Sequence, residues 1–220
     1  MKRLLITGDT HGFLDIEKLN KLPEELDKSD VLIILGDAGV CWNGKGEDEE
    51  LQKFYENKKF TTFIVDGNHE NHDLISELPI VERFGGKVRK VSDSVFYAIR
   101  GEVYEINGKR FLAIGGADSI DKKYRVEGLS WWKGETISES DILNALKNVG
   151  ETTIDFLITH TGGSAVSCEL GFPPSSSDKM LDKVIYSINY KYHYLGHHHI
   201  DKILNEKTRI LYDDIIEIKE

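Results

Sequence analysis

The chain has 220 residues, of which 40% are hydrophobic and 30% charged, a balance typical of one globular domain over residues 1–220. Its formal net charge of −10 argues against extended nucleic acid as a partner, because a phosphate backbone favours a basic face. No apolar stretch approaches the length of a signal peptide or a membrane span, so we expect no membrane partner.

The first 65 residues predict strands that alternate with helices. We expect strands at residues 4–7, 31–35 and 62–65, and helices at residues 15–21 and 48–59. Short apolar runs between helices indicate parallel strands joined by right-handed crossovers. Ligands of such sheets collect beyond the carboxyl ends of the strands.

The pattern changes to successive strands after a short helix predicted at residues 71–78. Asn107-Gly108 predicts a hairpin between two of these strands, which are expected at residues 87–91, 95–99, 102–106 and 110–114. This meander favours a second sheet packed on the first.

The last half combines two irregular segments with further helices and strands. Residues 115–136 are predicted to be irregular and residues 161–177 to form a long loop. Ser138 and Asp141 form a capping-box pattern at the start of a helix. The other expected elements are helices at 138–147 and 178–190 and strands at 155–159, 192–195, 202–204, 209–212 and 215–218.

Five short motifs directly follow predicted strands and carry side chains that bind metals. Together they supply two carboxylates, one carboxamide and several imidazoles, enough for two divalent ions, and they indicate metal-assisted hydrolysis of a phosphate ester. A single Asp or Asn beside Gly is explained as well by a turn, but five such motifs in order favour the metal site. They are Asp9-Thr10-His11, Gly36-Asp37, Gly67-Asn68-His69-Glu70, Thr159-His160 and Gly196-His197-His198-His199.

These motifs resemble those of the calcineurin-like metallophosphoesterase superfamily, whose pattern is D-x-H, G-D, G-N-H-D/E, a lone His and G-H-x-H. The resemblance extends from Asp9 to His199. It implies a mixed α/β fold of the metallo-dependent phosphatase type, with four layers, α/β/β/α, around two mixed sheets. It also implies a hydrolase with a binuclear metal centre.

The resemblance further implies a role for each motif residue. Asp37 would bridge two divalent or trivalent ions, with Mn, Fe or Zn expected, and a hydroxide between the ions would attack phosphorus. His69 would be the catalytic group that donates a proton to the leaving oxygen. One ion would be held by Asp9, His11, Asp37 and His199, and the other by Asp37, Asn68, His160 and His197.

One departure from the family bears on the substrate. The protein-phosphatase branch reads G-D-x-x-D-R-G, whereas Val40 and Cys41 replace its second Asp and its phosphate-gripping Arg here. Arg125 is one candidate for the missing contact with phosphate, although the simpler interpretation is that it is a solvated loop residue. Trp131 and Trp132 are candidates for substrate contact or a lid, against the commoner role of packing.

We therefore expect a small phosphate ester as the substrate, with mono- and diesters both open. The alternatives are a nuclease-type phosphodiesterase and a phosphoprotein phosphatase. A non-catalytic scaffold of the same fold ranks last, because every ligand position and His69 are filled. Cys41 and Cys168 lack metal-ligand spacing, which favours a reduced, cytoplasmic chain. The oligomeric state is left open.

Overall fold

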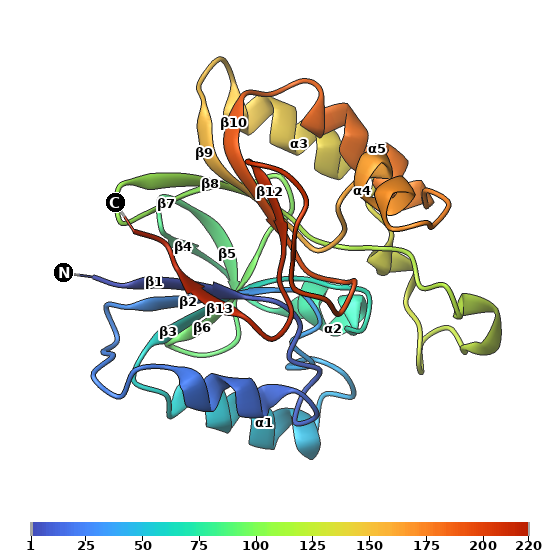
Figure 1. The fold of residues 1–220 in the computed structure, drawn as a ribbon. Coiled ribbons are helices and arrows are strands. Elements are labelled where there is room, and N and C mark those ends of the chain that lie inside the picture. Colours follow the sequence, from blue (N-terminus) through green and yellow to red (C-terminus); the bar gives the residue numbers. More distant parts are fainter. Residues whose placement is uncertain (1, 220) are drawn as a thin grey trace.

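Two stacked β-sheets form the centre of the protein, with helices on their outer faces (Figure 1). The computed structural model describes residues 2–219. One sheet has seven strands in the order β13-β1-β2-β3-β6-β5-β4, and the other has six in the order β11-β12-β10-β9-β8-β7.

The seven-stranded sheet has a parallel centre and antiparallel edges. Its parallel strands are β1 (Leu4–Thr7), β2 (Val31–Leu35), β3 (Thr61–Val65) and β6 (Val95–Ala98). The edges are β13 (Ile215–Glu217) on one side, and β5 (Gly86–Lys90) and β4 (Ile80–Arg83) on the other. Every residue of β1, β2 and β3 is buried, as expected for strands covered on both faces.

The six-stranded sheet repeats this plan. Its parallel strands are β8 (Lys109–Ile114), β9 (Ile154–Thr159), β10 (Tyr190–Leu195) and β12 (Thr208–Ile210), with β7 (Val103–Ile106) and β11 (Lys202–Ile203) antiparallel at the edges. Asn107 and Gly108 join β7 to β8 with φ of 51° and 71°, which matches the tight hairpin predicted for this pair.

Three hydrophobic layers hold the sheets and helices together. Phe63, Phe111 and Phe156 pack between the sheets. The outer face of the first sheet is covered by α1 (Glu47–Glu56), α2 (His72–Glu77) and the 3₁₀-helix η1 (Ile16–Lys21), and that of the second by α3 (Glu139–Val149) and α5 (Ser176–Ile185). The four-layer α/β/β/α prediction is therefore confirmed (Figure 1).

The structure corrects three local expectations. The loop predicted at residues 161–177 contains the helix α4 (Ser164–Glu169). The helix α5 begins at Ser176, two residues before the predicted start at residue 178, and Ser175 caps it. The segment at residues 15–21 forms a 3₁₀-helix. The sequence pattern missed β4, because its residues lie at an exposed edge without a buried face.

The irregular segment at residues 115–136 contains only two short 3₁₀-helices, η2 (Lys122–Tyr124) and η3 (Lys133–Glu135). In Figure 1 its middle part, coloured yellow-green, extends away from the sheets beyond α2. Between residues 2 and 219, the structure has no helix with the length and apolar character that spanning a membrane requires.

Candidate metal centre

The five motifs meet at one end of the two sheets. Asp9, Asp37 and Asn68 follow the carboxyl ends of β1, β2 and β3, which run parallel in one sheet. His160 follows β9, and His197 and His199 follow β10, its parallel neighbour in the other sheet. Because both sets of strand ends lie at the same end of the sandwich, residues nearly 200 positions apart become neighbours.

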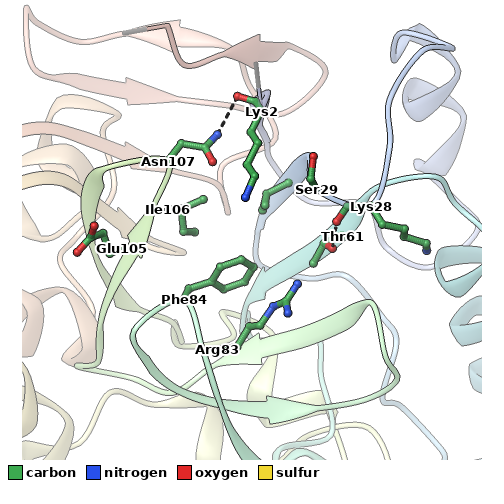
Figure 2. A pocket seen from close by; sticks show the side chains of 10 residues that line it. Lys2, Lys28, Ser29, Thr61, Arg83, Phe84, Glu105, Ile106 and Asn107 are labelled. Atoms are coloured by element: carbon green, nitrogen blue, oxygen red, sulfur yellow. Dashed lines mark hydrogen bonds between the residues drawn. The ribbon is translucent and has the colours of Figure 1, made fainter.

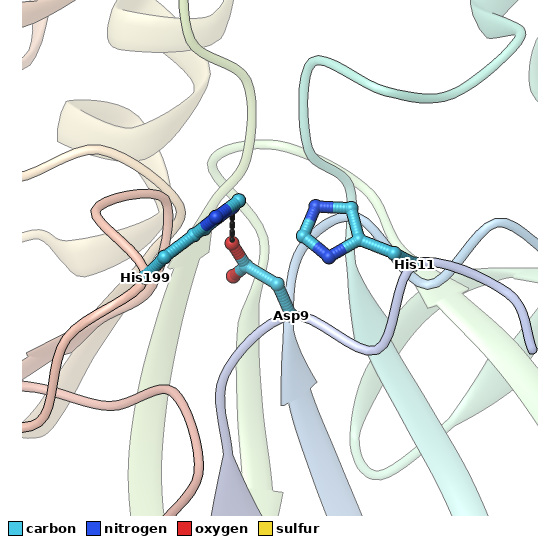
Figure 3. Close-up of side chains that lie close together, drawn as sticks. All are labelled: Asp9, His11 and His199. Atoms are coloured by element: carbon cyan, nitrogen blue, oxygen red, sulfur yellow. Dashed lines mark ion pairs between the residues drawn. The ribbon is translucent and has the colours of Figure 1, made fainter. Parts of the chain in front are cut away.

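One group of possible metal ligands consists of Asp9, His11 and His199, whose ligand atoms all lie within 4.8 Å of one another. Figure 3 shows the rings of His11 and His199 on either side of the Asp9 carboxylate. His199 Nε2 lies 3.3 Å from Asp9 Oδ2, and His11 Nε2 lies 3.5 Å from Asp37 Oδ2.

A second group consists of Asp9, Asp37 and His160, again with ligand atoms within 4.8 Å of one another. His160 Nε2 lies 3.4 Å from Asp37 Oδ2 and 3.0 Å from Asn68 Oδ1. The His197 ring packs edge-on against the His160 ring at a centroid distance of 4.9 Å. Asp37 thus faces one imidazole of each group.

The spacing of these atoms fits bound cations. Asp9 and Asp37 are fully buried, and within residues 2–219 no Lys or Arg forms an ion pair with either carboxylate. The contacts of 3.3–3.5 Å between imidazole nitrogens and carboxylate oxygens exceed the ~2.7–2.9 Å of charge-assisted hydrogen bonds. Ligands that share an ion at about 2.0–2.2 Å lie about 3.0–3.5 Å apart, so the donor set suits a divalent metal.

Two of the imidazole rings have a hydrogen-bond partner at Nδ1. Leu35 O lies 2.7 Å from His160 Nδ1, and Asp15 Oδ2 lies 2.7 Å from His11 Nδ1. Because Nδ1 of each ring carries the proton of this hydrogen bond, Nε2 is the nitrogen left to hold a metal ion when one binds. Asp15 was not predicted to belong to the site. The only indication in the sequence is its position four residues after His11.

The backbone at the site adopts conformations that ordinary residues seldom take. Four motif residues have left-handed φ angles, a strain that structures retain mostly at functional sites. They are His11 at 43°, Asp37 at 48°, His197 at 67° and His199 at 50°.

Three of the motifs contain a glycine that packs closely against the site, and a Cβ on Gly36 would overlap the His160 ring. A Cβ on Gly67 would overlap the Asp37 carboxylate, and a Cβ on Gly196 would overlap that of Asp9. A side chain at any of these positions would therefore displace a proposed metal ligand.

Opposing electrostatic effects act on the buried carboxylates. Burial alone raises the pKa of Asp37, but His160 and the other imidazoles outweigh it and hold that pKa well below its usual value. Burial opposes the charge on His160, yet Asp37 and Asp9 raise its pKa to about 10. Burial lowers the pKa of His197 to about 3, which keeps this imidazole neutral, the form in which it binds metals.

His69 lies beside these groups without joining them. Its backbone N–H donates to Asp37 Oδ1 at 2.7 Å, and its ring lies 5.9 Å from the His11 ring. Burial, with a smaller contribution from the positive charge of Arg125, lowers the pKa of His69. Among residues 2–219 no group hydrogen-bonds to its ring.

Comparison with known proteins identifies the family. A model of the calcineurin-like phosphoesterase family matches residues 2–201. The chain belongs to this family. The fold is similar to the crystal structure of phosphopantetheinyl hydrolase from Mycobacterium tuberculosis, with 16% sequence identity, a TM-score of 0.51 and coverage of 96% of this chain and 88% of that one. No curated protein matches the chain significantly.

The family assignment makes the protein a metal-dependent phosphoric ester hydrolase. This confirms the resemblance and the enzyme class expected from the motifs. The geometry brings together five candidate metal-binding residues in this metal-dependent family, Asp9, His11, Asp37, His160 and His199.

Arg125 lies in the irregular segment of this phosphoesterase. Its Nε pairs with Asp121 Oδ1 at 2.6 Å and its Nη1 donates to Ser130 O at 3.0 Å. The positive charge of its guanidinium contributes to lowering the pKa of His69. A shallow hollow of about 540 Å³ adjoins Arg125 and is also lined by Ile120, Lys122, Lys123, Glu127 and Trp131.

Trp131 and Trp132 are largely buried, with 8% and 4% of their surfaces exposed. Trp132 packs edge-on against Trp42 at 4.9 Å, and Lys122 lies over the Trp131 ring at 4.0 Å. Packing is therefore their visible role, and a lid formed by either ring stays a prediction.

A separate hollow of about 440 Å³ lies at the opposite end of the strands (Figure 2). Lys2 and Arg83 point into it beside Phe84, and Thr61 marks the start of β3 on its wall. The metal-binding motifs lie beyond the other ends of these strands, so this hollow is not part of the phosphoesterase site.

Proposed function

We propose that the protein hydrolyses a small phosphate ester with two metal ions, held by Asp9, His11, Asp37, Asn68, His160, His197 and His199. The observation that carries the proposal is the position of Asp37 Oδ2, 3.5 Å from His11 Nε2 and 3.4 Å from His160 Nε2. A carboxylate that faces a ligand of each group is suited to bridge two ions. When bound, such ions neutralise charge on phosphoryl oxygens and lower the pKa of water.

Each residue of the site has a separate proposed role. Asp9, His11 and His199 would hold one ion together with Asp37, and Asn68, His160 and His197 would hold the other. Asp15 and Leu35 O fix the ring orientation of His11 and His160. A preorganised site of this kind saves the cost of ordering its groups during the reaction.

We assign the general-acid role to His69. Its lowered pKa favours the neutral ring in the free protein, whereas the negative charge of a bound phosphate stabilises the protonated ring. A protonated His69 beside the leaving oxygen can donate the proton that a poor leaving group needs.

A compact ester fits the surroundings of the site better than a folded phosphoprotein. Val40 and Cys41 are buried, so neither supplies the phosphate contact that an Arg makes in the protein-phosphatase branch. Arg125 is the cation we propose for that contact, since its charge reaches His69. Exposed apolar side chains stand on the same segment and are suited to an apolar part of the substrate: Ile120, Tyr124, Val126 and Leu129.

The remaining parts of the proposal concern the setting of the reaction. Residues 1–220 act as one domain, and Mn, Fe or Zn are the metals best suited to this mix of oxygen and imidazole ligands. The free thiols of Cys41 and Cys168 support a cytoplasmic location. The solved neighbour is described as a phosphopantetheinyl hydrolase, which supports ester chemistry of a similar class on this fold.

The test is a substrate screen on one preparation of the protein. Metal is removed by chelation and restored as Mn, Fe or Zn, and hydrolysis is measured for small monoesters, small diesters, phosphopeptides and DNA. We expect metal-dependent turnover that is fastest on a small ester. Much higher kcat/KM on DNA or phosphopeptides would contradict the substrate class, and turnover unaffected by chelation would contradict the metal mechanism.

A further inference from the structure

A buried chain of hydrogen bonds holds the Asn68 side chain from outside the five motifs. Asn68 Nδ2 donates to Ser119 Oγ at 3.1 Å, and Ser119 Oγ donates to Glu135 Oε2 at 2.6 Å. Glu135 Oε1 also accepts from the Ser119 backbone N–H at 3.0 Å. Asn68, Ser119 and Glu135 expose only 4%, 8% and 0% of their surfaces, so water does not compete for these bonds.

This chain of bonds favours one orientation of the Asn68 amide. The Ser119 hydroxyl has a single proton, which it donates in its hydrogen bond to the Glu135 carboxylate. Ser119 Oγ therefore presents only lone pairs to Asn68. These lone pairs accept a hydrogen bond from an N–H group but repel an amide oxygen. Asn68 therefore turns its NH₂ group to Ser119 and its Oδ1 to His160 Nε2, 3.0 Å away.

Glu135 is itself fixed relative to the strand that carries Asn68. Arg100 donates to the backbone carbonyls of Gly134, Glu135 and Thr136 at 2.9, 3.3 and 3.1 Å. The same guanidinium donates through Nε to Asp66 Oδ2 at 2.8 Å, and Asp66 directly follows β3. The carboxylate of Glu135 is thus tied to the end of β3 through its own backbone.

We propose that Ser119 and Glu135 are positioning residues that present Asn68 Oδ1 to the metal ion shared with Asp37 and His160. This inference rests on the proposed metal site. Loss of the Ser119 hydroxyl lets the amide rotate, which offers NH₂ instead of oxygen to the ion. Within residues 2–219, Asp9, His11 and His199 form no hydrogen bond with Ser119, so this group should keep its affinity.

The test compares Ser119→Ala with the wild-type protein in calorimetric titrations of the metal-free protein with Mn²⁺. EPR of the loaded protein then distinguishes paired from single ions. We expect two binding events in the wild type and a loss of about 10–100-fold in one of them in Ser119→Ala, with the other unchanged. Glu135→Gln should weaken the same event by a smaller factor, because Gln still accepts a hydrogen bond.

The Asn68→Asp background separates positioning from general stability. A carboxylate has two equivalent oxygens, so its orientation no longer depends on Ser119. In this background Ser119→Ala should cost no metal affinity, whereas a purely structural role predicts the same loss in both backgrounds. Ser138→Ala is the control, since Ser138 belongs to the α3 capping box and, within residues 2–219, forms no hydrogen bond with a proposed metal ligand, so both binding events should stay unchanged.

Two results would count against the inference. Unchanged affinities in Ser119→Ala, or an equal loss in both backgrounds, would overturn the positioning role and leave the proposed metal site intact. A wild-type protein that binds fewer than two Mn²⁺ ions would instead overturn the proposed function and the inference with it.

Discussion

Substituting Asn for Asp37 should remove most of the stabilisation that metals give the protein. Asp37 is 1% exposed and faces His11 and His160 from opposite groups of ligands, so one change weakens both proposed sites. The amide retains the size of the side chain and an oxygen that can accept from the His69 N–H. The change therefore removes charge with little change in packing.

The metal-free protein should lose only part of its stability through this change. Ligand atoms of Asp9, Asp37 and His160 lie within 4.8 Å, where two unit charges interact by about 3.5 kcal/mol at an effective dielectric constant of about 20. Asp37→Asn relieves repulsion of that size from Asp9. It also removes a comparable attraction to His160, whose raised pKa of about 10 keeps it protonated. Because the imidazoles hold the pKa of Asp37 well below its usual value, the lost attraction is the larger effect, and the metal-free variant should be less stable than the metal-free wild type.

The loaded protein should lose much more. Metal at 1,000 times its Kd stabilises by about 4.1 kcal/mol per site, or about 8 kcal/mol for two. A 100-fold weaker Kd at each site leaves about 1.4 kcal/mol per site, or about 3 kcal/mol. At about 2–4 °C per kcal/mol for a chain of this size, the metal-induced rise in Tm should fall from about 16–32 °C to about 6–12 °C.

The assay is thermal unfolding with and without saturating Mn²⁺. Asp178→Asn is the matched control, because Asp178 is a buried carboxylate that accepts from Thr161 and Ser167 outside the metal site. It should lower Tm equally in both conditions. A full metal-induced rise in Asp37→Asn would refute the bridging role of Asp37.

Three further predictions follow from the same geometry. His69→Asn should keep both metals but slow turnover by about 10²–10⁴ on alkyl phosphates and less on p-nitrophenyl esters, and an equal loss on both would argue against a general acid. Arg125→Ala should lower kcat/KM by about 10–100-fold without changing metal affinity, with Lys123→Ala as the control; unchanged kinetics would exclude Arg125 from substrate binding. His193 is buried against Thr159, and burial lowers its pKa to about 3, so the unfolded chain takes up its proton first as pH falls below about 6.5. His193→Gln should therefore reduce the loss of unfolding free energy between about pH 6.5 and 3 by up to about 1.4 kcal/mol per pH unit, measured by denaturant titration at each pH. If the pH dependence of the unfolding free energy were unchanged in the variant, a group other than His193 would be responsible for it.

The sequence predicted the sheets because their central strands are continuous apolar runs. The runs at residues 4–7 and 31–35 are buried on both faces, so their composition alone marks them as strands. The polar motif after each run then lies at the sheet edge, which is why the residues that meet at the site were recognisable. The edge strand Ile80–Arg83 was missed because its mixed, exposed residues have no buried face.

The supporting residues of the site could not be predicted in the same way. Ser119 contacts Asn68 across 51 positions, and Glu135 contacts Ser119 across 16, within a segment that has no periodic pattern. Their hydrogen bonds depend on how that segment packs, which residue types do not reveal. Asp15 is closer, four residues from His11, but a carboxylate at that spacing is common on any helix or turn.

Anomalous diffraction from crystals loaded with Mn²⁺ would locate the bound ions themselves. We expect two peaks about 3.5–4 Å apart, with the Asp37 carboxylate between them. One peak should contact Asp9, His11 and His199, and the other should contact Asn68, His160 and His197. A single peak, or peaks that do not contact Asp37, would contradict a binuclear centre in this phosphoesterase.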